Sequence, residues 1–175
     1  MTLRRRVRAV AYRTAYRIPT RWRRRMVRVF APKFIIGAVV LVRDADAEPS
    51  DAGRIMLQRQ PPGHGWSIPG GLLERGEEPA EGAARELFEE SGVRVPASEL
   101  TALNPNVVVH TDGRWLDCVF EAHIPADTPF VVDGGEVFEA AWHRLDALPP
   151  LTVPTARLLA LYGIGPYVDY PEAQR

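Results

Sequence analysis

The sequence lacks the features of several protein classes. Cys118 is its only cysteine, so an intramolecular disulfide and a cysteine-rich structural zinc site are both excluded. The apolar run from Ile35 to Val42 is far shorter than the roughly 18 residues that a bilayer-spanning helix needs. Residues 1–33 contain no Asp or Glu. We therefore expect a cytoplasmic protein without a membrane-spanning helix, in which charge is unevenly distributed along the chain.

The charge is balanced in total but not along the sequence. The 175 residues include 22 Lys plus Arg and 22 Asp plus Glu, and 46% of them are hydrophobic. This composition is typical of one globular domain with a short appendage. Residues 1–33 hold eleven Arg and Lys33, a charge of +12, so residues 34–175 carry −12. We predict a basic helical arm at 1–33, a folded domain at 34–165 and an irregular tail at 166–175.

Two short amphipathic helices are expected in the basic arm. Apolar residues recur at three- and four-residue spacing from Leu3 to Ile18, and Pro19 interrupts the pattern. A second apolar stripe runs through Thr20 to Phe30. Three interpretations are open: the helices pack on the acidic domain or across a homodimer, they lie on an anionic membrane surface and make the protein peripheral there, or they contact nucleic acid. The last is disfavoured because no base-stacking or groove-reading motif accompanies the charge.

From residue 34 onward, β-type runs alternate with turn-forming residues. Glu78 to Ser91 is rich in Ala, Glu, Leu and Arg and ends before Gly92, which predicts a helix with a glycine just past its end. Val153 to Tyr162 is expected to form the last helix. Cys118 alternates with apolar residues on one strand and is expected in the core. The other expected segments are strands at 34–43, 54–60, 102–110, 115–124 and 137–144, a Gly/Pro-rich loop at 61–71 and a hairpin turn at 111–114.

Three glutamates of the predicted 78–91 helix share one face. Glu86, Glu89 and Glu90 stand at positions i, i+3 and i+4, where side chains are neighbours and like charges repel. Hard divalent cations such as Mg²⁺ prefer carboxylate oxygens and would relieve this repulsion. Arg85 is available to pair with an acid of the preceding loop, for which Glu77 is the candidate. The pattern indicates a divalent-cation site, and a solvated acidic face is the alternative.

The segment 71–93, GLLERGEEPAEGAARELFEESGV, resembles the box of the Nudix (MutT-like) hydrolase family without a departure. The similarity extends over about residues 34–162 and leaves the arm unexplained. It implies an α/β fold, an α/β/α sandwich with a mixed β-sheet. The positions that match the box are Gly71, Glu77, Arg85, Glu86, Leu87, Glu89, Glu90, Gly92 and Val93.

The resemblance also implies a reaction. In this family a divalent metal promotes attack of water on a diphosphate linkage, commonly in a nucleoside diphosphate derivative. It therefore implies a nucleotide pyrophosphohydrolase with Mg²⁺ or Mn²⁺ as cofactor and a small-molecule diphosphate as substrate. Two alternatives are a Nudix module that senses a nucleotide without cleaving it and an enzyme similar to isoprenoid-diphosphate isomerases. The intact box weighs against both, and the second also lacks a suitable reactive cysteine.

Roles for individual residues follow from the same resemblance. The expected metal ligands are the Gly70 carbonyl and the side chains of Glu86, Glu89 and Glu90. Arg85 is expected to hold Glu77 in support of these ligands.

The general base varies within the family. We expect it among Glu89, Glu90 and Glu136, the last of which lies on a later loop. Candidates for contact with the substrate come from the end of the second strand and from the loop before the box. They are Arg59, His64 and Trp66.

Overall fold

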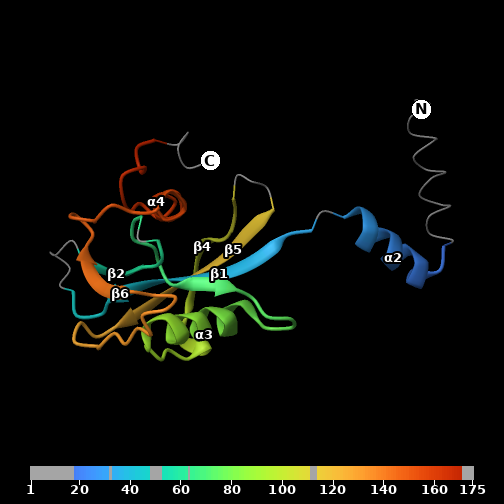
Figure 1. The fold of residues 1–175 in the computed structure, drawn as a ribbon. Coiled ribbons are helices and arrows are strands. Elements are labelled where there is room, and N and C mark those ends of the chain that lie inside the picture. Colours follow the sequence, from blue (N-terminus) through green and yellow to red (C-terminus); the bar gives the residue numbers. More distant parts are fainter. Residues whose placement is uncertain (1–17, 32, 48–52, 63, 111–113, 171–175) are drawn as a thin grey trace. The chain divides into compact units, whose positions relative to one another are not determined.

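The computed structural model describes residues 18–31, 33–47, 53–62, 64–110 and 114–170 (Figure 1). The chain divides into two compact units, Met1–Lys33 and Phe34–Arg175. In the first unit, helix α2 spans Thr20–Phe30, which confirms the second helix expected in the arm. The expected first helix, up to residue 17, and the turn at 111–113 lie outside the described residues. None of the described helices has the length and hydropathy that crossing a bilayer requires.

The second unit is built on a six-stranded mixed sheet. The strand order is β4-β5-β1-β2-β6, and the short β3 also pairs with β1. β1 runs parallel to β5, whereas the other pairings are antiparallel. The strands are β1 (Ile35–Asp44), β2 (Arg54–Arg59), β3 (Gly70–Leu72), β4 (Thr101–Val109), β5 (Trp115–Ile124) and β6 (Glu139–Arg144).

Two helices cover opposite faces of this sheet (Figure 1). Successive residues of a strand point to opposite faces, and β1 is apolar at both sets of positions. Ala38 and Val40 belong to the core that includes Leu87 of α3 (Pro79–Ser91). Leu41 belongs to the second core, which includes Leu159 of α4 (Val153–Ala160). The predicted α/β/α sandwich with a mixed sheet is therefore confirmed.

Local signals set both ends of α3. At its start, the backbone N–H of Glu78 donates to Glu81, and the Glu78 side chain accepts from the same turn, which forms a capping box. Pro79 follows at the first position of the helix, where it has no N–H to leave unpaired. At its end, Gly92 adopts φ 72° and its N–H donates to the Phe88 carbonyl, a left-handed cap that favours glycine. The helix predicted at 78–91 is thus confirmed to within one residue.

A few element boundaries differ from the sequence-based expectation. The loop expected at 61–71 ends in β3, because Gly70–Leu72 pairs with Gly37–Val39 of β1. The last helix ends at Ala160 rather than at residue 162. β6 begins at Glu139 rather than at residue 137. A short 3-10 helix, Ala97–Glu99, lies between α3 and β4. Cys118 is 7% exposed within the α3-side core, as predicted.

Candidate active site

Arg85 of α3 contacts three glutamates at once. Its Nε and Nη2 donate to the two oxygens of Glu77, at 2.8 and 3.0 Å, so the predicted pair is present. Nη1 donates to Glu86 at 2.8 Å and to Glu89 at 3.0 Å. These contacts hold the pKa of the Glu77 carboxyl below its usual value and raise the pKa of the Arg85 guanidinium, with Glu77 as the largest cause in the latter case. One cation is thus shared among three carboxylates, so most of the negative charge on this side of the helix is not compensated.

The same guanidinium ties the helix to the loop before it. Nη2 of Arg85 also donates to the Leu72 carbonyl at 3.0 Å, and Glu77 accepts from the backbone N–H of Glu74 at 2.8 Å. The carboxylate of Glu86 lies directly against Gly71, where the Cβ of any other residue would overlap it. Gly71 is therefore required for the close approach of Glu86 to the loop.

The three glutamates of α3 differ in solvent exposure because they project from one face of the helix at different angles. Glu90 follows the buried Leu87 by three positions, so it projects from the side of α3 that faces the sheet and is only 6% exposed. The Glu86 side chain is 16% exposed, and that of Glu89 is 55% exposed. The three carboxylates therefore extend from the edge of the core to solvent.

Glu90 is a buried carboxyl with two hydrogen-bond donors. It accepts from the backbone N–H of Gly70 at 2.8 Å and from the side-chain amide of Gln60 at 2.7 Å. Burial raises the pKa of Glu90 to about 7, and the charges of Glu86 and Glu136 add to this rise. The Gly70 N–H and the nearby amide of Gln58 offset the rise in part. Glu90 is thus poised to change charge near neutral pH in the metal-free protein.

Glu136 approaches the helix glutamates from another part of the chain. It lies on the exposed loop before β6, and its backbone N–H donates to Asp133 at 3.2 Å. Its charge acts on Glu90, so the loop brings it within electrostatic reach of α3. The structure thus gathers the three glutamates expected to include the general base. Which of them accepts the proton stays a prediction.

The donor set fits a hard divalent cation. Among the described residues, no three His, Cys, Asp or Glu side chains already converge as a metal cage. The glutamates at 86, 89 and 90 nevertheless supply carboxylate oxygens from one helix face, which Mg²⁺ and Mn²⁺ prefer as ligands. Beside Glu90, the fully buried Gln58 amide has no hydrogen-bond partner of normal geometry in the described structure. A bound cation would add to the partial charge compensation that Arg85 gives. The ligand role of the Gly70 carbonyl stays a prediction.

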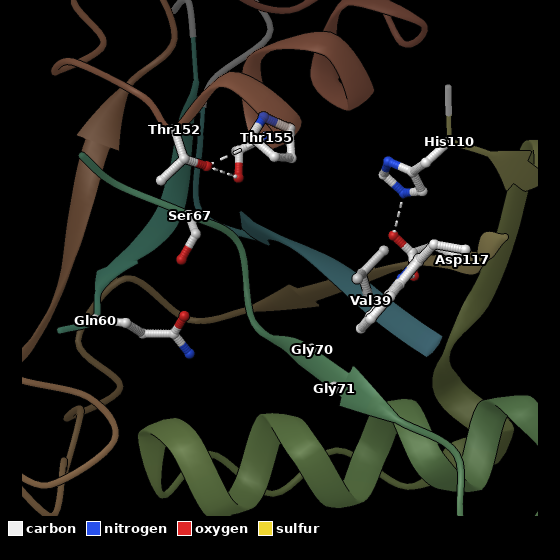
Figure 2. Close-up of a pocket in the computed structure, with 11 residues that line it drawn as sticks. Val39, Gln60, Ser67, Gly70, Gly71, His110, Asp117, Thr152 and Thr155 are labelled. Carbon is white, nitrogen blue, oxygen red and sulfur yellow. Dashed lines mark hydrogen bonds and ion pairs between the residues drawn. The ribbon is translucent and has the colours of Figure 1, made fainter. Parts of the chain in front are cut away.

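A pocket of about 490 Å³ adjoins Gly70 and Gly71. Figure 2 shows these two glycines between α3 and the pocket, with Thr152 and Thr155 at the α4 side. Thr152 caps α4, and its hydroxyl is bonded to the Thr155 hydroxyl at 2.8 Å. The pocket is lined by Val39, Gln60, Ser67, Gly70, Gly71, His110, Trp115, Asp117, Thr152, Pro154 and Thr155. It therefore places a mostly apolar surface, with a few polar side chains, next to the candidate catalytic helix.

A buried carboxylate fixes one wall of this pocket. Asp117, 7% exposed, accepts from the Trp115 indole N–H at 2.7 Å, and its other oxygen is 2.7 Å from Nε2 of His110. This contact fixes the orientation of the His110 ring. The second ring nitrogen of His110 is turned toward the pocket (Figure 2). The pocket wall therefore presents a fixed imidazole to any ligand.

The sequence analysis did not select these three pocket residues. The hairpin register could have found them: β4 and β5 pair Val109 with Leu116, and the His110 N–H donates to the Trp115 carbonyl at 2.9 Å. This register places the end of β4 beside the start of β5. In this register His110 lies opposite Trp115, two residues before Asp117, and that grouping is the signal that the sequence offered.

The three residues expected to contact the substrate do not line the pocket. Arg59 donates to Glu139 at 2.8 Å. The ring of Trp66 packs edge-on against His143, with centroids 4.3 Å apart. His64 is exposed on its loop. Their contact with a substrate stays a prediction.

Cys118 lies outside this site's chemistry. It is buried on β5, and burial, with a smaller effect of the Asp117 charge, raises the pKa of its thiol. A buried thiol with a raised pKa is a poor nucleophile. This weighs against the isomerase alternative, which calls for a reactive cysteine.

Comparisons with known proteins agree with this geometry. A family model described as the NUDIX domain matches residues 33–162. A MutT-like protein of Streptomyces ambofaciens is 44% identical over 54 residues, which are 31% of this chain and 35% of that protein. The chain spans about a third, or less, of the length of the curated relatives that it matches.

Solved structures give the same result. The crystal structure of a MutT NUDIX hydrolase from Burkholderia pseudomallei is 27% identical, with a TM-score of 0.54, over 70% of this chain and 93% of that chain. An Ap4A hydrolase from C. elegans has a TM-score of 0.51 and 17% identity, over 80% of this chain and 90% of that chain. At that identity, the second likeness concerns the fold alone.

The burial of Glu90 predicts how stability depends on pH. Its pKa of about 7 lies above the ordinary 4.5, so between these values the folded protein keeps a proton that the unfolded chain has lost. The metal-free wild type therefore loses stability as pH rises through this window, on the order of 3 kcal/mol in full. Glu90→Gln has no carboxyl that can lose this proton. Its free energy of unfolding, relative to that of the wild type, should therefore rise as pH rises.

Urea unfolding with EDTA at about pH 5 and about pH 8 measures this difference. Glu89→Gln is the matched control: it removes a carboxylate from the exposed side of the same helix and retains Glu90, so it should follow the wild-type pH dependence. Equal pH dependence in Glu90→Gln and the wild type would contradict the raised pKa.

Proposed function

This chain belongs to the Nudix family, and from that premise we propose that it is a nucleotide pyrophosphohydrolase, which uses water and Mg²⁺ to cleave the diphosphate linkage of a nucleoside diphosphate derivative. The observation that carries the proposal is the gathering of three carboxylates on one helix face: Glu86 and Glu89 share Arg85, and Glu90 accepts from the Gly70 N–H. Carboxylates held this close to one another, without a second cation, form an incomplete electrostatic site. A divalent cation completes it.

The chemistry explains why such a site is suited to a diphosphate. The negative oxygens of a diphosphate repel an incoming nucleophile. A bound Mg²⁺ neutralises charge on those oxygens and makes water more acidic. Glu86, Glu89 and Glu90 would provide oxygen ligands to the metal, while Arg85 and Glu77 hold the loop against the helix. Glu136, on the loop before β6, is the one candidate for the general base that lies outside α3.

The pocket suits the part of the substrate that is not diphosphate. Its volume, about 490 Å³, lies in the range of small-molecule sites. Gly70 and Gly71 belong both to the pocket wall and to the loop against α3. A substrate that places its diphosphate over the helix glutamates can therefore extend its other group into the pocket. A mostly apolar lining with a few polar side chains, such as His110 and Gln60, suits a flat group that also carries hydrogen-bonding atoms, such as a nucleoside.

The first test is a substrate panel. Purified protein is incubated with Mg²⁺ and nucleoside triphosphates, nucleotide sugars, ADP-ribose, dinucleotides and CDP-alcohols, and the products are separated chromatographically. We expect cleavage of one class at its diphosphate, and a drop in turnover of at least about 100-fold in Glu90→Gln and Glu89→Gln, because each removes a charged oxygen but little volume.

The outcomes of the panel are distinct. Near-normal turnover in both variants would contradict the assignment of the site. Binding of a nucleotide in a thermal-shift assay, with no turnover of any class in Mg²⁺, would replace the hydrolase proposal with the non-catalytic sensor. Circular dichroism of both variants shows whether they are folded.

The pocket wall gives a prediction about affinity. His110→Ala removes the imidazole that Asp117 holds toward the pocket, and one lost hydrogen bond corresponds to about tenfold in binding. For the substrate identified in the panel, we expect KM to rise by about that factor and kcat to change little. His123→Ala is the matched control, since His123 is on β5 but exposed and outside the pocket. An unchanged KM in His110→Ala would exclude this role.

A further inference from the structure

Helix α2 has two chemically opposed faces. At 3.6 residues per turn, four of its large apolar side chains fall within an arc of about 100°, and four of its five arginines fall on the opposite side. Arg23 and Val27 lie on the flank between these two faces. None of its residues is buried. The apolar face, defined by exposed residues, consists of Trp22 (51% exposed), Met26 (48%), Val29 (69%) and Phe30 (82%). The basic face consists of Arg21, Arg24, Arg25 and Arg28.

A contact between Arg25 and Trp22 joins the basic face to the apolar face. The guanidinium of Arg25 lies over the ring of Trp22, 5.9 Å from its centroid, a cation–π arrangement. An indole at the boundary between an apolar and a charged surface is typical of groups at the membrane–water interface, where one side is apolar and the other is wet. Phe30, the most exposed of the large side chains, lies on the same apolar face.

The opposition of these faces selects among partners. A nucleic acid would pair with the arginines and leave the apolar face in water. An acidic protein surface would likewise pair with the arginines and leave the apolar face in water. An apolar protein groove would cover Trp22 and Phe30 but would not neutralise the arginines of the basic face. The surface of an anionic bilayer satisfies both faces at once, because apolar side chains enter the acyl boundary while arginines stay among the phosphates.

We propose that α2 attaches this protein to the surface of a bilayer that contains anionic phospholipids. The helix lies in the plane of the interface with its apolar face toward the acyl chains. Charge supports the attachment: α2 carries five arginines and no acid, and the sequence before it adds six more arginines, again with no acid. The inference rests on α2 and not on the proposed hydrolase activity, so each can fail without the other.

The test uses the full chain and two kinds of vesicle. Flotation assays compare vesicles of phosphatidylcholine alone with vesicles of equal parts phosphatidylcholine and phosphatidylglycerol. We expect binding to the anionic vesicles and at least about tenfold weaker binding to the neutral ones, since each arginine near an anionic surface adds roughly fivefold in affinity. The binding should weaken as salt is added.

Two pairs of matched variants separate the faces. Met26→Ser with Phe30→Ser removes apolar area without changing charge, and should weaken vesicle binding at least about tenfold; Met26→Leu with Phe30→Leu is its control. Arg24→Gln with Arg28→Gln should weaken binding to anionic vesicles by on the order of tenfold, while Arg24→Lys with Arg28→Lys keeps the charge and most of the binding.

Several results would overturn the proposal. They are equal binding to both kinds of vesicle, absence of binding to either, and wild-type binding by the Met26→Ser, Phe30→Ser variant, which would show that charge alone holds the helix. Loss of a dimer in that variant on size-exclusion chromatography, without vesicle binding by the wild type, would assign the apolar face to a second copy of the chain instead.

Discussion

Repulsion among the glutamates of α3 is the interaction on which the arrangement of the site depends. Arg85 offsets it by contacting Glu77, Glu86 and Glu89 together. The apolar side of the same helix, with Ala83 and Leu87 fully buried, holds the helix on the sheet while the charged side stays crowded. Hydrophobic burial thus fixes in place a set of charges that would otherwise move apart. A divalent cation would then have to draw together carboxylates that already share one helix face.

Much of this could be predicted because it is local in the sequence. The 71–93 segment contains the helix, its glycine cap, the three glutamates and the Arg85–Glu77 pair. Helical spacing relates the three glutamates, and Glu77 lies in the loop just before the helix. The strands were found from alternation, and Cys118 was placed in the core for the same reason. The burial of Glu90 follows from its position three residues after Leu87, although its contact with Gly70 depends on how the loop returns along β1.

The pocket could not be predicted in the same way. His110 and Asp117 come from one hairpin, Gln60 and Ser67 from the loop before the box, and Thr152 and Thr155 from the start of α4. These segments meet only because β5 lies beside β1 and α4 covers that face of the sheet. Arg59 and Trp66 were expected to bind substrate because of their place beside the loop, yet Arg59 pairs with Glu139. Proximity in sequence to a motif did not determine which side chains line the cavity.

The most direct test of the central claim is Mn²⁺ binding, followed by electron paramagnetic resonance, in the wild type, Glu86→Gln and Gly71→Ala. The claim is that the crowded carboxylates of α3 form a divalent-cation site whose shape depends on the contact of Glu86 with Gly71. We expect Mn²⁺ to bind the wild type, and to bind both variants at least about tenfold more weakly while circular dichroism shows them folded. Unchanged Mn²⁺ affinity in both folded variants would contradict it.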